Sequence, residues 1–530
     1  MSLKRSMLTR RTLLAGLPLL LLGASAPFAL QAAASSWRAY RSPFSLGIAS
    51  GSPSPEGFVL WTRLLGDEVP QDQALLVDWQ VFVWDDPQQV VAAGQAWAVP
   101  ELAHSVHVEV SGLPADRWYG YRFQAGGQQS PPGRTRTMPE AGAVPARLRF
   151  AYASCHSWEL GYYAAYRQMQ QEDLDLVLFV GDYIYEYAGS QKLGAHNVRF
   201  HHLPKARTLA DFRNHYALYK SEPLLQAMHA HCPWLVVWDD HEVENDYAGI
   251  HSIYATEGFF QLRAAAYQAY YEHMPLPLAT LQQGIAGMQR GAEMRIYDRV
   301  AFGRLALFHL LDCRQYRDAP LCPDRVEPNR QANCQPAHPS RSMLGVGQEE
   351  WLEEGLRVSA ELPCLWNVIV SQSRFTPGNY AEGLAVMASR DRWDGFPEAR
   401  QRLLQALLRH RPRNPVIIGG DIHYHWVARV HQDPYDVRSP VLASEFIGTS
   451  ITSRSGRNQE ATDRHAAQNP HCLLSYSEKR GYGVVEITPK KSEIILRVVE
   501  NVRDEHSPVT TLARFEVMDG QPVRACQNNS

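Results

Sequence analysis

The chain has 530 residues, of which 45% are hydrophobic and 20% are charged, and its formal net charge is −3. This composition excludes a disordered chain, a collagen-like chain, a coiled coil and a small disulfide-stabilised protein. The nearly balanced charge gives no sign of the basic surface that nucleic-acid-binding domains carry. We therefore expect a folded protein of about two to four domains.

Residues 1–34 are typical of a secretory signal. They begin with basic residues and no acid, continue as an apolar run over 12–30, and end in the small residues Ala32–Ala34. The pair Arg10 and Arg11 resembles the twin-arginine signal, whose translocon exports folded proteins. We predict a twin-arginine signal peptide and a periplasmic or secreted mature protein without a stable membrane span. The alternative is a permanent membrane anchor.

The next region, residues 37–140, has the pattern of an all-β domain. β-branched and aromatic runs alternate with turns rich in glycine and proline. The runs cover 58–61, 77–84, 106–110 and 118–123. We predict a β-sandwich similar to a fibronectin type III domain, and it contains no catalytic pattern.

From residue 146 to 530, short apolar runs alternate with helical stretches, which predicts an α/β domain in layers, an α+β sandwich. The predicted strands are 148–153, 176–180, 234–238, 305–311, 366–370 and 416–418, with a late hairpin over 483–499. The predicted helices are 162–171, 258–273, 348–356 and 397–410.

Four of these strands are followed by side chains of the types that bind metals. They are Cys155, Asp182 with Tyr185, Asp240 with His241, and Asp421 with His423. Ligands of α/β proteins bind outside the carboxyl ends of the strands, so we expect these four ends to meet at one sheet edge. Several buried carboxylates repel one another unless a cation compensates them, which predicts a metal site. Oxygen ligands suit Ca²⁺, Mg²⁺ or Fe³⁺, and imidazole admits iron or zinc.

Each of these residues also has a purely structural explanation. Cys155, for example, could be a core residue or half of a disulfide. The coincidence of four such strand ends favours a metal site. A zinc protease would need a second histidine after His241 and Glu242, and it is absent. A non-haem iron oxygenase could use Asp421, His423 and His425 as a facial triad, but this leaves the other strand ends unexplained.

The motifs resemble those of a known family. Gly181-Asp182 followed by Tyr185 resembles the GDxxY motif of purple acid phosphatases, and Asp240–Glu242 and Gly420–His423 are similar to motifs of the wider metallophosphoesterase superfamily. Cys155 in place of the first aspartate, and Asp421 in place of a histidine, resemble the alkaline phosphatase D (PhoD) family. The likeness covers nearly the whole chain after the predicted signal.

This resemblance implies an exported phosphoric ester hydrolase, an alkaline phosphatase or phosphodiesterase, with a metallophosphoesterase αββα domain after the sandwich. It implies that Fe³⁺ is held by Cys155, Asp182, Tyr185 and His423, and that Ca²⁺ is held by Asp182, Asp240 and Asp421. His241 would be the catalytic acid beside a metal-bound hydroxide. Purple acid phosphatases have a histidine after the strand at 366–370. This chain lacks it, and an oxygen of Gln372 could substitute. An exported binding protein without phosphate-ester turnover is the alternative.

Of the eight cysteines, Cys322 and Cys334 lie in a loop rich in proline, asparagine and arginine. A disulfide there would be useful in an exported protein. The pairing of the other cysteines cannot be read from the sequence.

Overall fold

The structure is a computed structural model that describes residues 37–190, 194, 196–287, 293–320, 338–362, 364–379 and 389–526. The predicted signal peptide, Cys322 and Cys334 therefore lie outside the described residues. Within the described part of the chain, none of the helices has both the length and the apolar character needed to cross a membrane.

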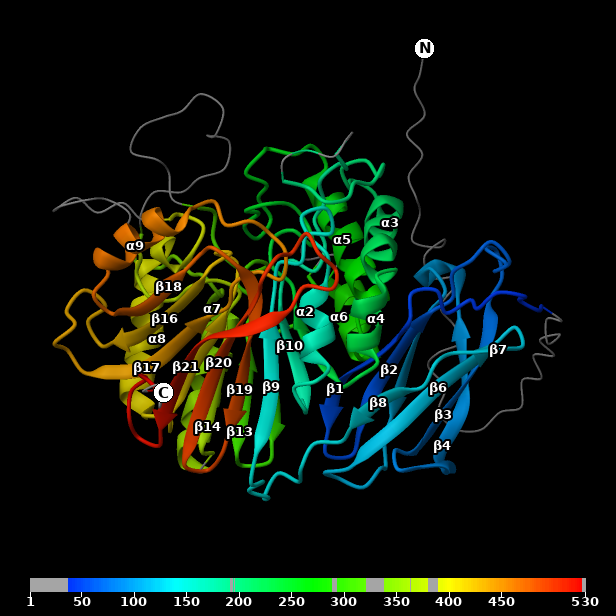
Figure 1. Ribbon diagram of the computed structural model, residues 1–530, viewed down its shortest axis with the longest axis horizontal. Coiled ribbons are helices and arrows are strands. Elements are labelled where there is room, and N and C mark those ends of the chain that lie inside the picture. The colour runs from blue at the N-terminus through cyan, green and yellow to red at the C-terminus, as the bar shows by residue number, and fades with distance from the viewer. Residues whose placement is uncertain are drawn as a thin grey trace, which may run out of the picture. The chain divides into compact units, whose positions relative to one another are not determined.

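The region after residue 37 forms two facing β-sheets, as predicted (Figure 1). One contains β1 (Ile48–Ser54), β2 (Gly57–Arg63) and β5 (Ser105–Val110). The other contains β3 (Leu75–Val83), β4 (Asp86–Ala98), β6 (Trp118–Ala125), β7 (Gln128–Gln129) and β8 (Gly133–Arg136). The rings of Phe58 on β2 and Tyr119 on β6 lie 6.0 Å apart between the sheets, because alternate residues of each strand face the other sheet.

One sheet of this sandwich continues into the rest of the protein. β1 pairs in parallel with β11 (Trp234–Val237), with Gly51 opposite Trp234. The result is a ten-stranded sheet in the order β22-β21-β20-β19-β9-β10-β11-β1-β2-β5. The sequence did not predict this connection, because an apolar pattern shows which face of a strand is buried but not which strand lies beside it.

The remaining strands complete two sheets that pack face to face. The ten-stranded sheet also contains β9 (Leu148–Ala153), β10 (Leu176–Val180), β19 (Arg480–Ile487), β20 (Lys491–Val499), β21 (Val509–Met518) and β22 (Arg524–Ala525). The second sheet contains seven strands: β12 (Asp298–Phe302), β13 (Ala306–Leu310), β14 (Trp366–Val370), β15 (Pro415–Gly419), β16 (His425–His431), β17 (Val441–Ile447) and β18 (Cys472–Tyr476). Phe150 and Phe308 meet edge to face between the two sheets at 5.2 Å, within a core to which both sheets contribute.

Helices contact both sheets, which confirms the layered α/β prediction (Figure 1). α7 contacts β13 and α8 contacts β17 in the seven-stranded sheet, while α2, α4 and α5 contact strands of the ten-stranded sheet. The described α-helices are α2 (Ala164–Met169), α3 (Leu209–Lys220), α4 (Pro223–His229), α5 (Phe259–His273), α6 (Leu278–Gly287), α7 (Val346–Glu361), α8 (Pro397–His410) and α9 (Gln459–Ala467), and the 3-10 helices η1 and η3 span Pro100–Leu102 and Trp393–Gly395. α8 begins at a proline and buries Leu403, Leu404 and Leu407, the spacing of one helix face.

The four strand ends with metal-type side chains do not belong to one sheet, contrary to the sequence prediction. β9, β10 and β11 are neighbours in the ten-stranded sheet, whereas β15 belongs to the seven-stranded sheet. Their ends meet because the two sheets pack face to face. A Cβ atom on Gly420, after β15, would lie 2.2 Å from Ser154 Oγ, after β9, so only glycine allows this approach.

Candidate metal centre

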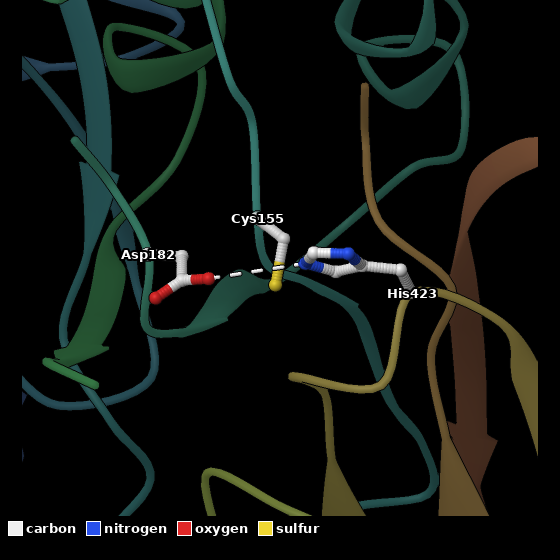
Figure 2. Close-up of side chains that lie close together, drawn as sticks. All are labelled: Cys155, Asp182 and His423. Carbon is white, nitrogen blue, oxygen red and sulfur yellow. Dashed lines mark ion pairs between the residues drawn. The ribbon is translucent and has the colours of Figure 1, made fainter. Parts of the chain in front are cut away.

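Three donor side chains converge where β9, β10 and β15 end. One ligand atom each of Cys155, Asp182 and His423 lies within 4.8 Å of the others. Figure 2 shows the thiol, the carboxylate and the imidazole pointing toward one another, with Asp182 Oδ2 and His423 Nε2 4.0 Å apart. Cys155 and Asp182 are buried. His423 thus lies beside two side chains that precede it by more than 200 positions in the sequence.

Four of the six predicted metal ligands have an uncommon backbone conformation. Cys155, Asp182, Asp421 and His423 have φ angles of 59°, 56°, 66° and 59°, the left-handed region that side chains other than glycine seldom occupy. Backbone strain of this kind costs about 1–3 kcal/mol per residue and is concentrated at functional sites. The local backbone conformation therefore lowers the stability of the fold, and it turns the donor side chains into the space between the sheets.

Tyr185 reaches the same cluster from the turn after β10. Its hydroxyl donates to Asp182 Oδ2 at 3.0 Å, lies 3.4 Å from His423 Nε2 and contacts Ser453 Oγ at 2.6 Å. Burial, and next the charge of Asp182, raise the pKa values of the Tyr185 phenol and the Cys155 thiol well above their usual ranges. Both groups stay protonated unless a cation replaces the proton, as metal ligands do.

Asp182 also belongs to a second group of donors, with Asp240 and His241, whose ligand atoms again lie within 4.8 Å of one another. Its Oδ1 atom is buried and has no hydrogen-bond partner among the described residues. Buried carboxylate oxygens are rarely left without a partner, and a cation bound to such an oxygen compensates both its charge and its missing hydrogen bond. The residues therefore fit a pair of cations that share Asp182.

His423 is oriented as a metal ligand would be. Its Nδ1 lies 2.7 Å from the carbonyl oxygen of Arg454. Because a carbonyl only accepts hydrogen bonds, Nδ1 carries a proton, and Nε2 is the nitrogen that faces Asp182 and Tyr185.

His241 is held by a carboxylate that the sequence analysis missed. Its Nδ1 donates to Glu186 Oε2 at 2.7 Å, and Glu186 Oε1 accepts from the backbone N–H of Asn245 at 3.0 Å. Burial lowers the pKa of His241, but the charges of Glu186, Asp182 and Asp240 outweigh burial and raise it well above its usual value. The neighbouring carboxylates therefore favour the protonated form of the ring. Because Nδ1 is bonded to Glu186, Nε2 is the ring nitrogen that can contact a ligand in the cavity.

The carboxylate of Asp240 is fixed from two sides. Its Oδ2 accepts from the backbone N–H of Asp246 at 2.7 Å, and its Oδ1 lies 3.4 Å from Arg314 Nη2. Arg314 is buried and also binds Asp239 and Asp391. Burial raises the pKa of Asp240 to about 6, although Arg314 and His241 oppose the shift.

Glu242 links two of the strand ends. Its carboxylate accepts from the backbone N–H groups of Asp182 at 3.1 Å, Tyr183 at 2.6 Å and Asp239 at 2.9 Å. It thereby ties the turn after β10 to the turn after β11. Glu242, the last residue of the Asp240–Glu242 motif, thus supports the backbone that carries Asp182.

Asp421 lies outside both donor groups but lines the same cavity of about 360 Å³ as Asp182, Asp240, His241 and His423. Its Oδ2 accepts from Arg392 Nε at 2.5 Å. The structure thus brings all seven predicted site residues to one place, six of them in tight contact and Asp421 at the cavity wall. The sequence did not single out the supporting residues Glu186, Arg314 and Arg392. Glu186 follows the GDxxY motif directly, and this position was the one available signal.

Two residues considered from the sequence do not reach the cavity. Gln372 donates to Leu311 O at 2.6 Å and accepts from Cys313 N at 3.0 Å, so it links two strand ends instead of lining the cavity. His425 begins β16, and its Nδ1 accepts from the N–H of Thr449 at 3.2 Å. A facial triad containing His425 is therefore not assembled.

Two packed sheets with helices outside, and carboxylate, imidazole, thiol and phenol groups between their strand ends, define a metal-dependent hydrolase of the metallophosphoesterase class. A family model described as PhoD-like phosphatase matches residues 150–496, and one described as PhoD-like phosphatase, N-terminal domain, matches residues 30–139. The chain belongs to the PhoD-like phosphatase family and is a phosphoric ester hydrolase.

Two relatives support this assignment. The chain is 40% identical over 482 residues to alkaline phosphatase D of Bacillus subtilis (strain 168), which covers 89% of this chain and 80% of the relative. A solved structure described as the structure of PhoD has a TM-score of 0.84 and 38% identity, and it covers 93% of this chain and 94% of its own.

Proposed function

We propose that this phosphatase works in the periplasm or outside the cell with a mixed Fe³⁺ and Ca²⁺ centre. In this proposal Fe³⁺ is held by Cys155, Asp182, Tyr185 and His423, and Ca²⁺ by Asp182, Asp240 and Asp421. The observation that carries it is the position of Asp182, which belongs to both donor groups and has a buried oxygen without a protein partner among the described residues.

The chemistry of the donors favours two different ions. Thiol and phenol groups become strong anionic donors to a trivalent transition metal, and the Nε2 lone pair of His423 suits iron as well. Carboxylate oxygens alone suit a hard ion such as Ca²⁺, which takes oxygen ligands. Asp182 can serve both ions because its two oxygens are distinct: Oδ2 faces Tyr185 and His423, and Oδ1 has no partner in the described part of the chain.

The reaction transfers a phosphoryl group from an ester oxygen to water. Bound cations neutralise the phosphate and lower the pKa of water toward neutrality. Glu186 holds the ring of His241, and in its protonated form His241 would donate from Nε2 to the departing ester oxygen. Such a positioned acid contributes a factor of about 10²–10⁴ in rate.

Export through the twin-arginine pathway is part of the proposal. It rests on the pattern of residues 1–34 and agrees with the iron assignment, because folded export permits iron to be inserted before the protein leaves the cell. Replacing Arg10 and Arg11 by lysine together should keep the protein inside the cell. Export that continues unchanged would contradict this part of the proposal.

The test of the metal assignment is elemental analysis of protein purified from its native export route. We expect iron and calcium in stoichiometric amounts, and turnover of p-nitrophenyl phosphate or its bis-ester that a calcium chelator abolishes and added Ca²⁺ restores. Zinc in place of iron, or turnover that survives complete removal of calcium, would overturn the assignment. The ratio of the two rates defines the preference between monoester and diester.

A further inference from the structure

Arg392 is fixed at the wall of the active-site cavity by its two neighbours in the chain. Asp391 accepts from Arg314 Nη1 at 2.7 Å and from Arg317 Nη2 at 2.5 Å. Trp393, the first residue of η3, is buried and donates to Ser371 Oγ at 3.0 Å. Because both flanking side chains are anchored in the protein, the backbone presents Arg392 at a defined position.

The guanidinium of Arg392 meets the proposed Ca²⁺ ligand Asp421. Nε donates to Asp421 Oδ2 at 2.5 Å, and the two side chains are 24% and 13% exposed. Both line the cavity that also contains Asp182, Asp240 and His241. The contact therefore places the guanidinium of Arg392 beside the proposed metal centre. Because the Arg392 side chain is only partly buried, a ligand in the cavity can reach it.

The charges of the proposed centre leave a role for this cation. Fe³⁺ and Ca²⁺ together carry five formal positive charges, and the five acidic ligands Cys155, Asp182, Tyr185, Asp240 and Asp421 carry five negative charges when ionised. His241 Nδ1 lies 2.7 Å from Glu186 Oε2, so this ring already faces a carboxylate. The charges of the proposed ions and their ligands therefore cancel, and arginine side chains beside these ligands, such as Arg392 next to Asp421, supply the positive charge that an entering phosphate meets.

Among the described residues that line the cavity, the arginines are Arg392 and Arg457. Arg457 lies in the loop after β17, between this cavity and a neighbouring one. Arg392 has the fixed backbone and the contact with a proposed ligand. An arginine presents five N–H donors in a rigid plane that matches carboxylate and phosphate oxygens, so one side chain can contact both at once.

We propose that Arg392 is a substrate-binding residue, which contacts a non-bridging oxygen of the phosphate while its Nε keeps Asp421 in place. The inference rests on the proposed function, because it takes the ligand set from there. It applies to monoesters and diesters, which share non-bridging oxygens. A lysine at this position would present one charged point, and it could contact Asp421 or the phosphate but not both.

The test compares Arg392→Gln and Arg392→Lys with the wild-type holoenzyme. Inorganic phosphate is titrated by calorimetry, metal content is measured by elemental analysis, and kcat and KM are determined for both p-nitrophenyl esters. We expect phosphate affinity and kcat/KM to fall about 10- to 100-fold in both variants, because each loses a hydrogen bond between charged groups. Iron and calcium should be retained. The control is Arg438→Gln, which removes an exposed arginine paired with Asp436 outside the cavity.

Two results would overturn the inference. Phosphate affinity within twofold of wild type would show that Arg392 does not bind the substrate. If phosphate affinity falls only to the extent that calcium is lost from the variants, Arg392 acts only by holding Asp421 and not by binding the phosphate. Thermal unfolding of Arg392→Lys distinguishes these results from misfolding, since a folded variant keeps the wild-type midpoint. If the wild-type protein itself binds no metal, the proposed function fails and this inference fails with it, whatever the variants do.

Discussion

Asp182 is the residue on which both donor groups depend, because it contributes to each of them. Asp182→Asn keeps the shape of the side chain and removes its charge. We expect both metals to be lost and kcat to fall by at least about 10³-fold, since the cations supply several kcal/mol of charge stabilisation. Elemental analysis and steady-state rates measure the two effects together. The exposed Asp436→Asn is the control, and retention of iron by Asp182→Asn would refute the shared position.

Glu186 orients the ring of His241. Variants can distinguish this positioning role from a direct contact of Glu186 with the substrate or a metal. His241→Ala should keep both metals and lose about 10²–10⁴ in kcat. Glu186→Gln removes the charge that favours the protonated ring, so kcat should fall about 10-fold or more, also with metals retained. The double variant should be no slower than His241→Ala alone, because Glu186 has nothing left to orient. Additive losses would mean that Glu186 contacts the substrate or a metal itself.

At the scale of elements, the sequence predicted those strands whose apolar runs end in sharp polar turns. β9, β10 and β14 have the predicted bounds, and α8 does as well. The missed strand β4 contains four alanines and three glutamines among its 13 residues and has no apolar alternation. It is a strand because its backbone pairs with β3 along nearly its full length. Intrinsic preference is weaker than such pairing, so composition alone could not reveal it.

The turn after β10 depends on a glycine. Gly181 has a φ of 104°, and a Cβ atom there would lie 2.5 Å from Asp239 Cβ and 2.6 Å from Asp239 N. Gly181→Ala should therefore displace the turn that carries Asp182, with a loss of about 1–3 kcal/mol in stability and reduced metal content. Gly142→Ala is the matched control, because nothing lies within 4 Å of its Cβ position. Equal melting temperatures and metal contents of the two variants would contradict this account.

For the molecule as a whole, the proposed metal ligands could be predicted from the sequence, whereas the residues and the sheet packing that position them could not. Donor residues after strands form a recognisable pattern, whereas Glu186 and Arg314 look like ordinary surface charges until the fold buries them. The packing of β15 against β9 and β10 across two sheets was likewise not predictable, because apolar runs do not specify which sheet a strand joins. The site therefore forms only when the two sheets pack against each other.

Lys220 connects the sandwich, a helix and the site turn, and its charge should limit the stability of the whole molecule. It ends α3, is 1% exposed, and its Nζ lies 4.1 Å from the ring centre of Trp61 on β2 and 5.3 Å from that of Tyr183. Burial lowers its pKa from 10.5 to about 7. Between these two values the unfolded chain binds a proton that the folded protein does not, so this residue makes stability rise with pH over that window.

Lys220→Met fills the same space without a charge and should raise the free energy of unfolding near pH 6.5 by about 1–4 kcal/mol. The gain should shrink by about 3 kcal/mol or less at pH 9.5, because the folded wild-type protein has by then released the proton. Urea unfolding of both proteins at the two pH values measures the difference. Lys220→Arg, which cannot lose its charge, should be less stable than wild type at both. A gain from methionine that is the same at both pH values would mean that packing, and not the buried charge, sets the stability here.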